Sequence, residues 1–246
     1  MIDFSILFED GEALVIDKPA GLPLDRPRAG GAALEDYLDA LRFGFQRPPA
    51  PVHRLDQDTS GCLLLARNPK ALKRFSAAFE ARLVEKVYLG IVAGPVAGEA
   101  GTIELSLAKI SSAEKGWRMI PAKKGKPAVT HWRVLDRQPE RTLVEFRPET
   151  GRTHQIRVHA LAGLGSPLLC DPIYGSGSGP GRGPLRTMLH AAAITIQREG
   201  KPPIAARAPL PMDFTVLGFS APEYDRSPAQ PDAPGPSYHD ASYHDD

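Results

Sequence analysis

Residues 53–67 read HRLDQDTSGCLLLAR, a dense polar loop that runs directly into an apolar segment. The apolar half, CLLLA at 62–66, is typical of a buried strand. Asn68 and Pro69 follow at once, and a capping side chain before a first-turn proline is a helix start. The stretch therefore predicts a loop, a strand and a helix in succession. The expected apolar face of that helix carries Leu72, Phe75, Phe79 and Leu83.

Upstream of this stretch the sequence predicts a hairpin and a short helix. The apolar runs SILFE at 5–9 and EALVIDKP at 12–19 flank the turn pair Asp10-Gly11. Three leucines at helical spacing then indicate a short helix before a proline-rich stretch. They are Leu34, Leu38 and Leu41.

Downstream, strands and helices continue to alternate. The segment KVYLGIVAG at 86–94 has the alternation of a strand, with Val87, Leu89 and Ile91 on one side and Tyr88 on the other. A helical pattern follows in HQIRVHALAGLG at 154–165. Further strands are expected at 102–108, 128–135, 142–147, 188–196 and 202–209.

This order of elements predicts an α+β fold. No regular βαβ repeat is present, and neighbouring strands are close enough to pair antiparallel, so we expect a mixed, largely antiparallel sheet flanked by helices, with a central catalytic cleft. One catalytic domain is expected over residues 1–220. Residues 221–246 turn to Pro, Ser, Asp and His and predict a disordered tail. The glycine-rich stretch 175–184 is expected to be a flexible loop, since it lacks the spacing of a phosphate-binding loop.

The net charge of +1 hides an uneven distribution of charge. Residues 223–246 hold six acids and one base, a net −5, which leaves +6 in residues 1–222. A basic cluster within the body could attract phosphate, although a solvated lysine-rich loop explains it equally well. The cluster consists of Lys109, Lys115, Arg118, Lys123, Lys124 and Lys126.

The composition also predicts the cellular setting. The chain has ordinary hydrophobic content (42%) and lacks an apolar run of membrane-spanning length. No basic segment precedes its first apolar residues, and acids follow them directly, so a secretory leader is not expected. The two cysteines, Cys62 and Cys170, form no CxxC pair and are expected to be reduced thiols. We therefore expect a cytoplasmic protein. A monomer is the default, because no segment marks an oligomer interface or an obligate protein partner.

Two polar segments carry the chemistry, HRLDQDTSG at 53–61 and TGRTHQIRVH at 150–159. Each lies at a junction between regular elements, where a rigid scaffold can offer side chains to a cleft. Turn formation explains residues 58–61, and helix capping explains Thr153, but neither explains the arginines and Asp56. A cation beside Asp56 would keep that carboxylate ionised, as a nucleophile or base requires. The residues alone leave open which arginine pairs with which acid.

HRLDQDTSG, KVYLG and TGRTHQIRVH, in that order, resemble the motif set of the RluA-like family of RNA pseudouridine synthases. VIDKPAGLPL at 15–24 and LLCDPIYG at 168–175 resemble the flanking motifs of that family, so the resemblance spans Ile6 to about Pro211. It implies the pseudouridine synthase fold and the isomerisation of a specific uridine in a stem-loop of tRNA or ribosomal RNA. The chain resembles the short members without an S4 RNA-binding domain. Cys170 replaces a residue that is more often glycine, so a local backbone adjustment is expected there.

The resemblance also implies roles for individual residues. Asp56 would be the catalytic aspartate, Arg157 its salt-bridge partner, and Tyr88 the residue that stacks on the flipped base and assists proton transfer. Arg54 is similar to the arginine that fills the gap left in the RNA. The remaining candidate contacts to the substrate are His53, Thr59, Arg152 and His154. The reaction only rearranges atoms, so neither a cofactor nor a metal is expected, and no metal-binding motif accompanies the histidines.

Two other functions are compatible with the residues. One is an RNA chaperone on this fold for which catalysis is dispensable. The other is an unrelated hydrolase that uses Asp56 with His53 or His154. Such a hydrolase would need an activated water and a metal or serine nucleophile, and the chain contains no G-x-S-x-G. The mass of the product distinguishes it, because isomerisation leaves the RNA mass unchanged.

Overall fold

The computed structural model describes residues 2–112, 116–175 and 186–222. Within them a single sheet runs through the molecule, in the order β1-β2-β4-β10-β5-β9-β8-β6-β7. β11 pairs with β10, and β3 pairs with β4. The loop expected at 175–184 and the tail expected at 221–246 lie outside the described residues, apart from Gly175, Ala221 and Pro222.

The elements follow one another along the chain with short connections. The strands are β1 (Ile6–Glu9), β2 (Ala13–Lys18), β3 (Ala50–Pro51), β4 (Ser60–Ala66), β5 (Val84–Ala93), β6 (Ala100–Ser112), β7 (Gly116–Pro121), β8 (Lys126–Gln138), β9 (Arg141–Pro148), β10 (Leu189–Arg198) and β11 (Lys201–Arg207). The helices are η1 (Leu34–Arg42, of the 3-10 type), α1 (Pro69–Glu80), α2 (Gln155–Leu164) and α3 (Met212–Val216). Among the described pairings only β4 and β10 run parallel, which confirms the mixed, largely antiparallel sheet.

Local hydrogen bonds explain why the first elements form where they were predicted. The Asp10 carboxylate accepts from the backbone N–H groups of Glu12 and Ala13, both at 2.8 Å, and so closes the β1–β2 turn. The Asn68 side chain accepts from the Ala71 N–H at 2.9 Å and caps α1. α1 ends at Glu80, however, and Leu83 lies beyond it with 68% of its surface exposed. The expectation that Leu83 belongs to the apolar face was wrong.

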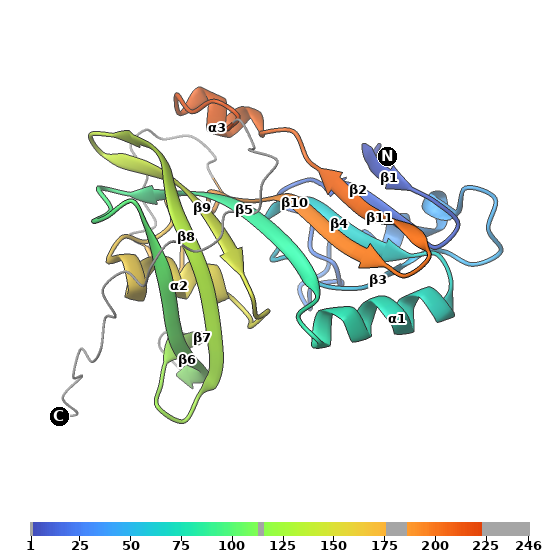
Figure 1. Cartoon of the computed structure of the whole chain (residues 1–246), viewed down its shortest axis with the longest axis horizontal. Helices are drawn as coiled ribbons and strands as arrows, with labels where there is room; N and C mark the ends of the chain where they lie inside the picture. Colours follow the sequence, from blue (N-terminus) through green and yellow to red (C-terminus); the bar gives the residue numbers. More distant parts are fainter. Residues whose placement is uncertain (1, 113–115, 176–185, 223–246) are drawn as a thin grey trace.

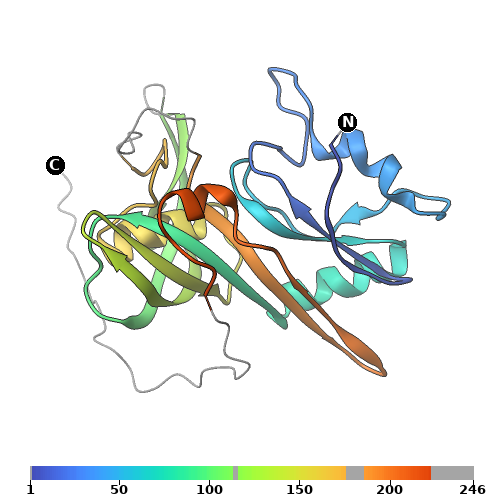
Figure 2. The ribbon, with the colours of Figure 1, turned by 90° about the horizontal axis from the view of Figure 1, so that it is seen from above.

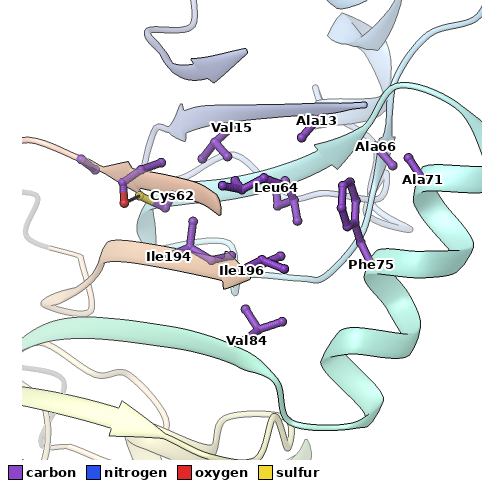
Figure 3. Close-up of a cluster of buried hydrophobic side chains, with 13 residues drawn as sticks. Ala13, Val15, Cys62, Leu64, Ala66, Ala71, Phe75, Val84, Ile194 and Ile196 are labelled. Carbon is purple, nitrogen blue, oxygen red and sulfur yellow. Dashed lines mark hydrogen bonds between the residues drawn. The ribbon is translucent and has the colours of Figure 1, made fainter. Parts of the chain in front are cut away.

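β4 lies in the interior, buried at every position between β2 and β10. Because successive side chains of a strand point to opposite faces, Leu64 packs toward Phe75 of α1, while Leu63 and Leu65 pack toward η1. Figure 3 shows Phe75 directed at Leu64 and Ala66, with Val15 and Ile194 completing the layer. Because both faces of β4 are covered by other elements, its sequence is a continuous apolar run and does not alternate between apolar and polar residues.

The sheet divides the molecule into two halves that meet at β10 and β5. Figure 1 shows β1, β2, β4, β11 and α1 in one half, and β6 to β9 with α2 in the other. The view from above in Figure 2 shows the same separation, with the β10–β11 hairpin extending along the N-terminal half. The loop before β4 and the start of α2 therefore approach each other from opposite halves, where β5 passes between them.

Three local interpretations of the sequence require correction. Residues 116–121 form strand β7, paired with β6, so the basic segment is a hairpin strand and a turn instead of one loop. Residues 60 and 61 begin β4 and are not turn residues. Thr153 does not cap α2. His154 occupies the cap position in a left-handed conformation (φ 53°) and makes no side-chain cap bond.

Cys62 and Cys170 are both free thiols, as the sequence predicted. Burial raises the pKa of the Cys62 thiol to about 12. Cys170 has a φ of 60°, in the left-handed region that favours glycine. None of the helices in the described ranges has the length and apolar character needed to cross a membrane.

Gly61 provides a test of how closely the parallel pair β4–β10 is packed. Its φ is +106°, and a Cβ built there would lie 2.2 Å from the carbonyl oxygen of Ala191 on β10. Gly61→Ala is therefore expected to destabilise the protein by more than about 2 kcal/mol, through backbone strain and collision together. Urea unfolding measures the change. Gly11→Ala is the matched control, since nothing lies within 4 Å of its added Cβ; equal stability of the two variants would contradict the described packing.

Candidate active site

A cavity of about 270 Å³ opens where the two halves meet. Its walls come from the loop before β4, from β5, and from the segment that joins β9 to α2. All eight candidate site residues from the sequence line this one cavity. They are His53, Arg54, Asp56, Thr59, Tyr88, Arg152, His154 and Arg157. The tertiary structure therefore brings together side chains from segments about 100 residues apart in the chain.

The loop that carries Asp56 is held by hydrogen bonds from two cations to its backbone. The fully buried Lys18 donates to the carbonyl oxygen of Gln57 at 3.0 Å, and to those of Pro19 and Leu22 at 2.8 Å. Arg186 donates to the Asp58 carbonyl at 2.8 Å. These bonds fix the backbone directly after Asp56, so its carboxylate projects from a rigid turn.

The Asp56 carboxylate faces the guanidinium group of Arg157. The Arg157 Nη1 to Asp56 Oδ2 distance is 3.2 Å, while 24% of the Asp56 side chain remains exposed toward the cavity. The sequence had left open which arginine pairs with which acid, and in the structure Asp56 pairs with Arg157. This pairing orients the carboxylate within the cavity, where it can act as a nucleophile or a base.

Asp171 is a site residue that the sequence analysis did not identify. Its carboxylate accepts two hydrogen bonds from Arg157, Nε to Oδ2 and Nη2 to Oδ1, both at 2.7 Å. It also accepts from the backbone N–H groups of Ile173 and Tyr174, and it is fully buried. The residue lies in the LLCDPIYG segment, so the motif marked the region without indicating a role.

The pKa values of Arg157 and Asp171 both shift in the direction that favours the charged form. Burial alone would raise the pKa of Asp171, but its bonds with Arg157 and with two amides lower it. Burial alone would lower the pKa of Arg157, but Asp171 and Asp56 raise it. Arg157 is therefore a permanent cation that one buried carboxylate holds in place and directs toward a second, more exposed one.

Tyr88 reaches the cavity from β5, whose neighbours in the sheet are β10 and β9. Burial raises the pKa of its phenol, and the nearby charge of Asp56 adds to that effect, so the hydroxyl is neutral at physiological pH. Leu89 and Ile91 on the same strand are buried in the core. The aromatic ring is thus a half-buried apolar surface beside the Asp56 carboxylate, a suitable place for a planar base.

His154 lies near Asp56 and connects the cavity to the β6–β7 hairpin. Its Nε2 is 3.8 Å from the Asp56 carboxylate, and its Nδ1 is 3.0 Å from the Tyr174 hydroxyl. Tyr174 in turn accepts from the Met119 N–H of β7 at 2.9 Å, and Trp117 packs against the His154 ring with a centroid distance of 4.8 Å. Burial lowers the pKa of His154, which favours the neutral imidazole.

The remaining four candidate residues differ in the hydrogen bonds that they already make and in their exposure. His53 accepts from the Leu64 N–H at 3.0 Å and stacks on Phe79, and burial lowers its pKa to about 4, so it is a neutral acceptor that also supports β4. Thr59 is buried. Arg152 donates one bond to the Pro127 carbonyl at 3.1 Å, and Arg54 is exposed at the edge of the cavity.

The basic cluster expected at 109–126 lies outside the lining of the cavity. Lys109 approaches the Trp117 ring, with its ammonium 5.0 Å from the centroid. Lys115 falls outside the described residues. Among the residues that are described, no group of three or more His, Cys, Asp or Glu side chains could hold a metal ion.

Comparison with known proteins agrees with this fold and site. A model of the RNA pseudouridylate synthase family matches residues 12–162. An uncharacterized RNA pseudouridine synthase of Zymomonas mobilis is 55% identical over 214 residues, which cover 87% of this chain and 97% of that protein. The ribosomal large subunit pseudouridine synthase D of Pseudomonas aeruginosa is 40% identical over 178 residues, 71% of this chain and 54% of that protein.

Solved structures show the same similarity in three dimensions. Human RNA pseudouridylate synthase domain containing 1 superposes with a TM-score of 0.71 and 30% identity, over 87% of this chain and 86% of that chain. Human RNA pseudouridylate synthase domain containing 4 gives the same TM-score at 26% identity, over 85% and 90%.

The fold and the comparisons together define the class, which is that of the enzymes that isomerise uridine in RNA. The chain belongs to the RNA pseudouridylate synthase family, in its RluA-like group, and its substrate is RNA. This confirms the resemblance drawn from the sequence motifs.

Proposed function

We propose that this enzyme isomerises one specific uridine in a stem-loop of tRNA or ribosomal RNA, by flipping the base into the cavity and using Asp56 as the catalytic carboxylate. The observation that carries the proposal is the position of Asp56, which lies in the cavity with Arg157 at 3.2 Å and Tyr88 beside it. Relatives named ribosomal large subunit pseudouridine synthase D support a ribosomal substrate.

The reaction breaks the C1′–N1 bond of uridine, forms a C1′–C5 bond, and moves the C5 proton to solvent while N1 gains one. Asp56 would promote the cleavage, either by attacking C1′ or by removing a ribose proton, and both routes need its ionised form. Arg157 contacts the carboxylate at 3.2 Å and would fix its orientation. No redox change occurs, so we propose that the reaction needs neither cofactor nor metal.

The other lining residues would bind and hold the RNA. Extrusion of the uridine costs a few kcal/mol, and stacking of the base on Tyr88 would return about 1–3 kcal/mol. Arg54, exposed at the edge of the cavity, would occupy the gap in the RNA. His53, Thr59, Arg152 and His154 would contact the target nucleotide or its phosphates. We propose residues 1–220 as the catalytic unit, acting as a cytoplasmic monomer.

The test is carbodiimide-based mapping of pseudouridine in total RNA that is verified to be unmodified beforehand. Incubation with the enzyme is expected to produce a new site in a tRNA or ribosomal stem-loop, with the mass of the RNA fragment unchanged. A change of mass would indicate a hydrolase. RNA binding without any new site would favour the chaperone function, in which catalysis is dispensable.

A further inference from the structure

Lys86 lines the same cavity as the proposed catalytic residues. It precedes Tyr88 by two positions on β5, so both side chains point to the same face of the sheet. Glu85, the acid next to it in the chain, is exposed and points to the other face. Lys86 is partly buried, which places an ammonium group inside the cavity wall.

Within the described parts of the chain, the ammonium group of Lys86 has few polar contacts. Its one polar contact there is the Thr150 carbonyl at 3.5 Å, at the limit of a hydrogen bond, and it forms no ion pair. By contrast, the buried Lys18 donates to three carbonyls at 2.8–3.0 Å. Burial lowers the pKa of Lys86 to about 8, and it lowers that of Lys18 to about 8 as well, so the two lysines differ in their hydrogen bonds and not in their pKa.

Among the described residues that line the cavity, Asp56 is the one carboxylate, and the other ionisable groups are neutral or cationic. The loop before β4 contributes the neutral His53 and the cation Arg54, and α1 contributes Phe79. β9 contributes Pro148, and the segment before α2 contributes the Thr150 carbonyl and the cation Arg152. A partly buried cation with three further cations on the same cavity, of which Arg157 is paired with Asp56, is suited to an anionic ligand.

Among the described ion pairs, the Asp56 carboxylate is paired with Arg157 at 3.2 Å and not with Lys86. The charge of Asp56 influences the pKa values of Lys18, Tyr88 and His154, whereas burial alone lowers that of Lys86. Lys86 instead acts on His53, whose pKa its charge helps to lower. With the reacting base between Asp56 and Tyr88, the part of the cavity near Lys86 and His53 would receive the sugar–phosphate chain.

We propose that Lys86 binds a backbone phosphate adjacent to the target uridine once that base occupies the cavity. The proposal rests on the proposed function, because it requires the uridine to enter this cavity. It distinguishes Lys86 from the surface lysines of the 109–126 cluster, which would attract RNA before the base has flipped.

The experiment measures the binding of a fluorescein-labelled stem-loop transcript that contains the uridine found by mapping, across a range of salt concentrations. Lys86→Met is expected to raise Kd about tenfold, since the lost bond joins two charged groups. The slope of log K against log salt should fall by about 0.7–0.9, the value for one phosphate contact. The kcat at saturating RNA should stay within about twofold of wild type.

A second measurement uses the pH dependence of Kd between neutral and mildly alkaline pH. Phosphate binds the protonated amine, so affinity should be constant below the pKa of about 8 and then fall by up to about tenfold per pH unit above it. Lys86→Arg should bind RNA without this decline, because guanidinium stays protonated throughout. The effect should therefore be present in wild type and absent from both variants.

Lys70→Met is the matched control, since it removes one exposed lysine of α1 that does not line the cavity. Its salt slope and its pH dependence should match those of wild type. The proposal is overturned if Lys86→Met keeps the wild-type slope, or if it loses kcat with Kd unchanged. Because the wild-type enzyme still modifies RNA in either case, such a result leaves the proposed function standing.

Discussion

Asp56→Asn is expected to abolish pseudouridine formation while leaving RNA binding within about tenfold of wild type. The amide has almost the same shape as the carboxylate, but it is neither nucleophilic nor basic, so the rate should fall by roughly four orders of magnitude or more. Binding should persist because the cavity cations that would contact the RNA remain. The loss of one negative charge can even strengthen binding slightly.

Single-turnover mapping at the identified uridine measures this loss of rate, and titration of the same RNA measures the affinity. Asp3→Asn, the same chemical change at an exposed position away from the cavity, should retain wild-type rates. Substantial activity in Asp56→Asn would refute the proposed mechanism, whichever route the carboxylate takes.

Arg157→Met is expected to have the second largest effect, acting on both activity and stability. It leaves the fully buried Asp171 carboxylate without its two bonds from the guanidinium, and an uncompensated buried charge of this kind costs about 3–5 kcal/mol. It also removes the cation at 3.2 Å from Asp56. Loss of activity in this variant alone could therefore reflect unfolding.

The double variant Arg157→Met with Asp171→Asn separates the two effects. It contains no unpaired buried charge, so urea unfolding should show most of the lost stability restored. Activity should stay low, because Asp56 still lacks its partner. Recovery of activity along with stability would show that Arg157 is needed only for the fold.

Asp171→Asn alone tests whether Asp171 positions the guanidinium. Arg157 would retain Asp56 as a partner but lose the carboxylate that holds its other side, and a displacement of about 1 Å can cost about 100-fold in rate. We expect kcat to fall with KM nearly unchanged, because Asp171 is fully buried and does not line the cavity. A change confined to KM would argue against a positioning role.

The agreement between prediction and structure is best for features that depend on a few consecutive residues. Asp10 and Asn68 make the turn and cap bonds expected of them, because each side chain reaches an N–H only two or three residues away. Leu83 was misplaced because helical spacing continues past Glu80 in the sequence, whereas the chain there leaves α1 for β5. The β7 strand was missed because its pairing with β6 outweighs the weak strand pattern of a charged segment.

At the candidate site, too, the sequence predicted the residues involved better than the contacts between distant segments. The motifs were sufficient to select eight residues that line one cavity, because their residue types and order are specific to this family. Their spacing in the chain could not indicate that Arg157 binds Asp171 more closely than Asp56, with bonds of 2.7 Å against 3.2 Å. Nor could it show that Lys86 is buried without a carboxylate partner among the described residues.

The sequence by itself thus determined most of the elements, the family and the chemical groups available for catalysis, since these follow from local bonding and residue identity. Only the tertiary structure decided which charges meet. Ion pairing depends on distances of a few ångströms between segments up to 101 residues apart, and those distances exist only after β5 lies between β10 and β9 in the sheet. Burial has the same origin, and it is burial that sets the pKa values and the cost of each unpaired charge.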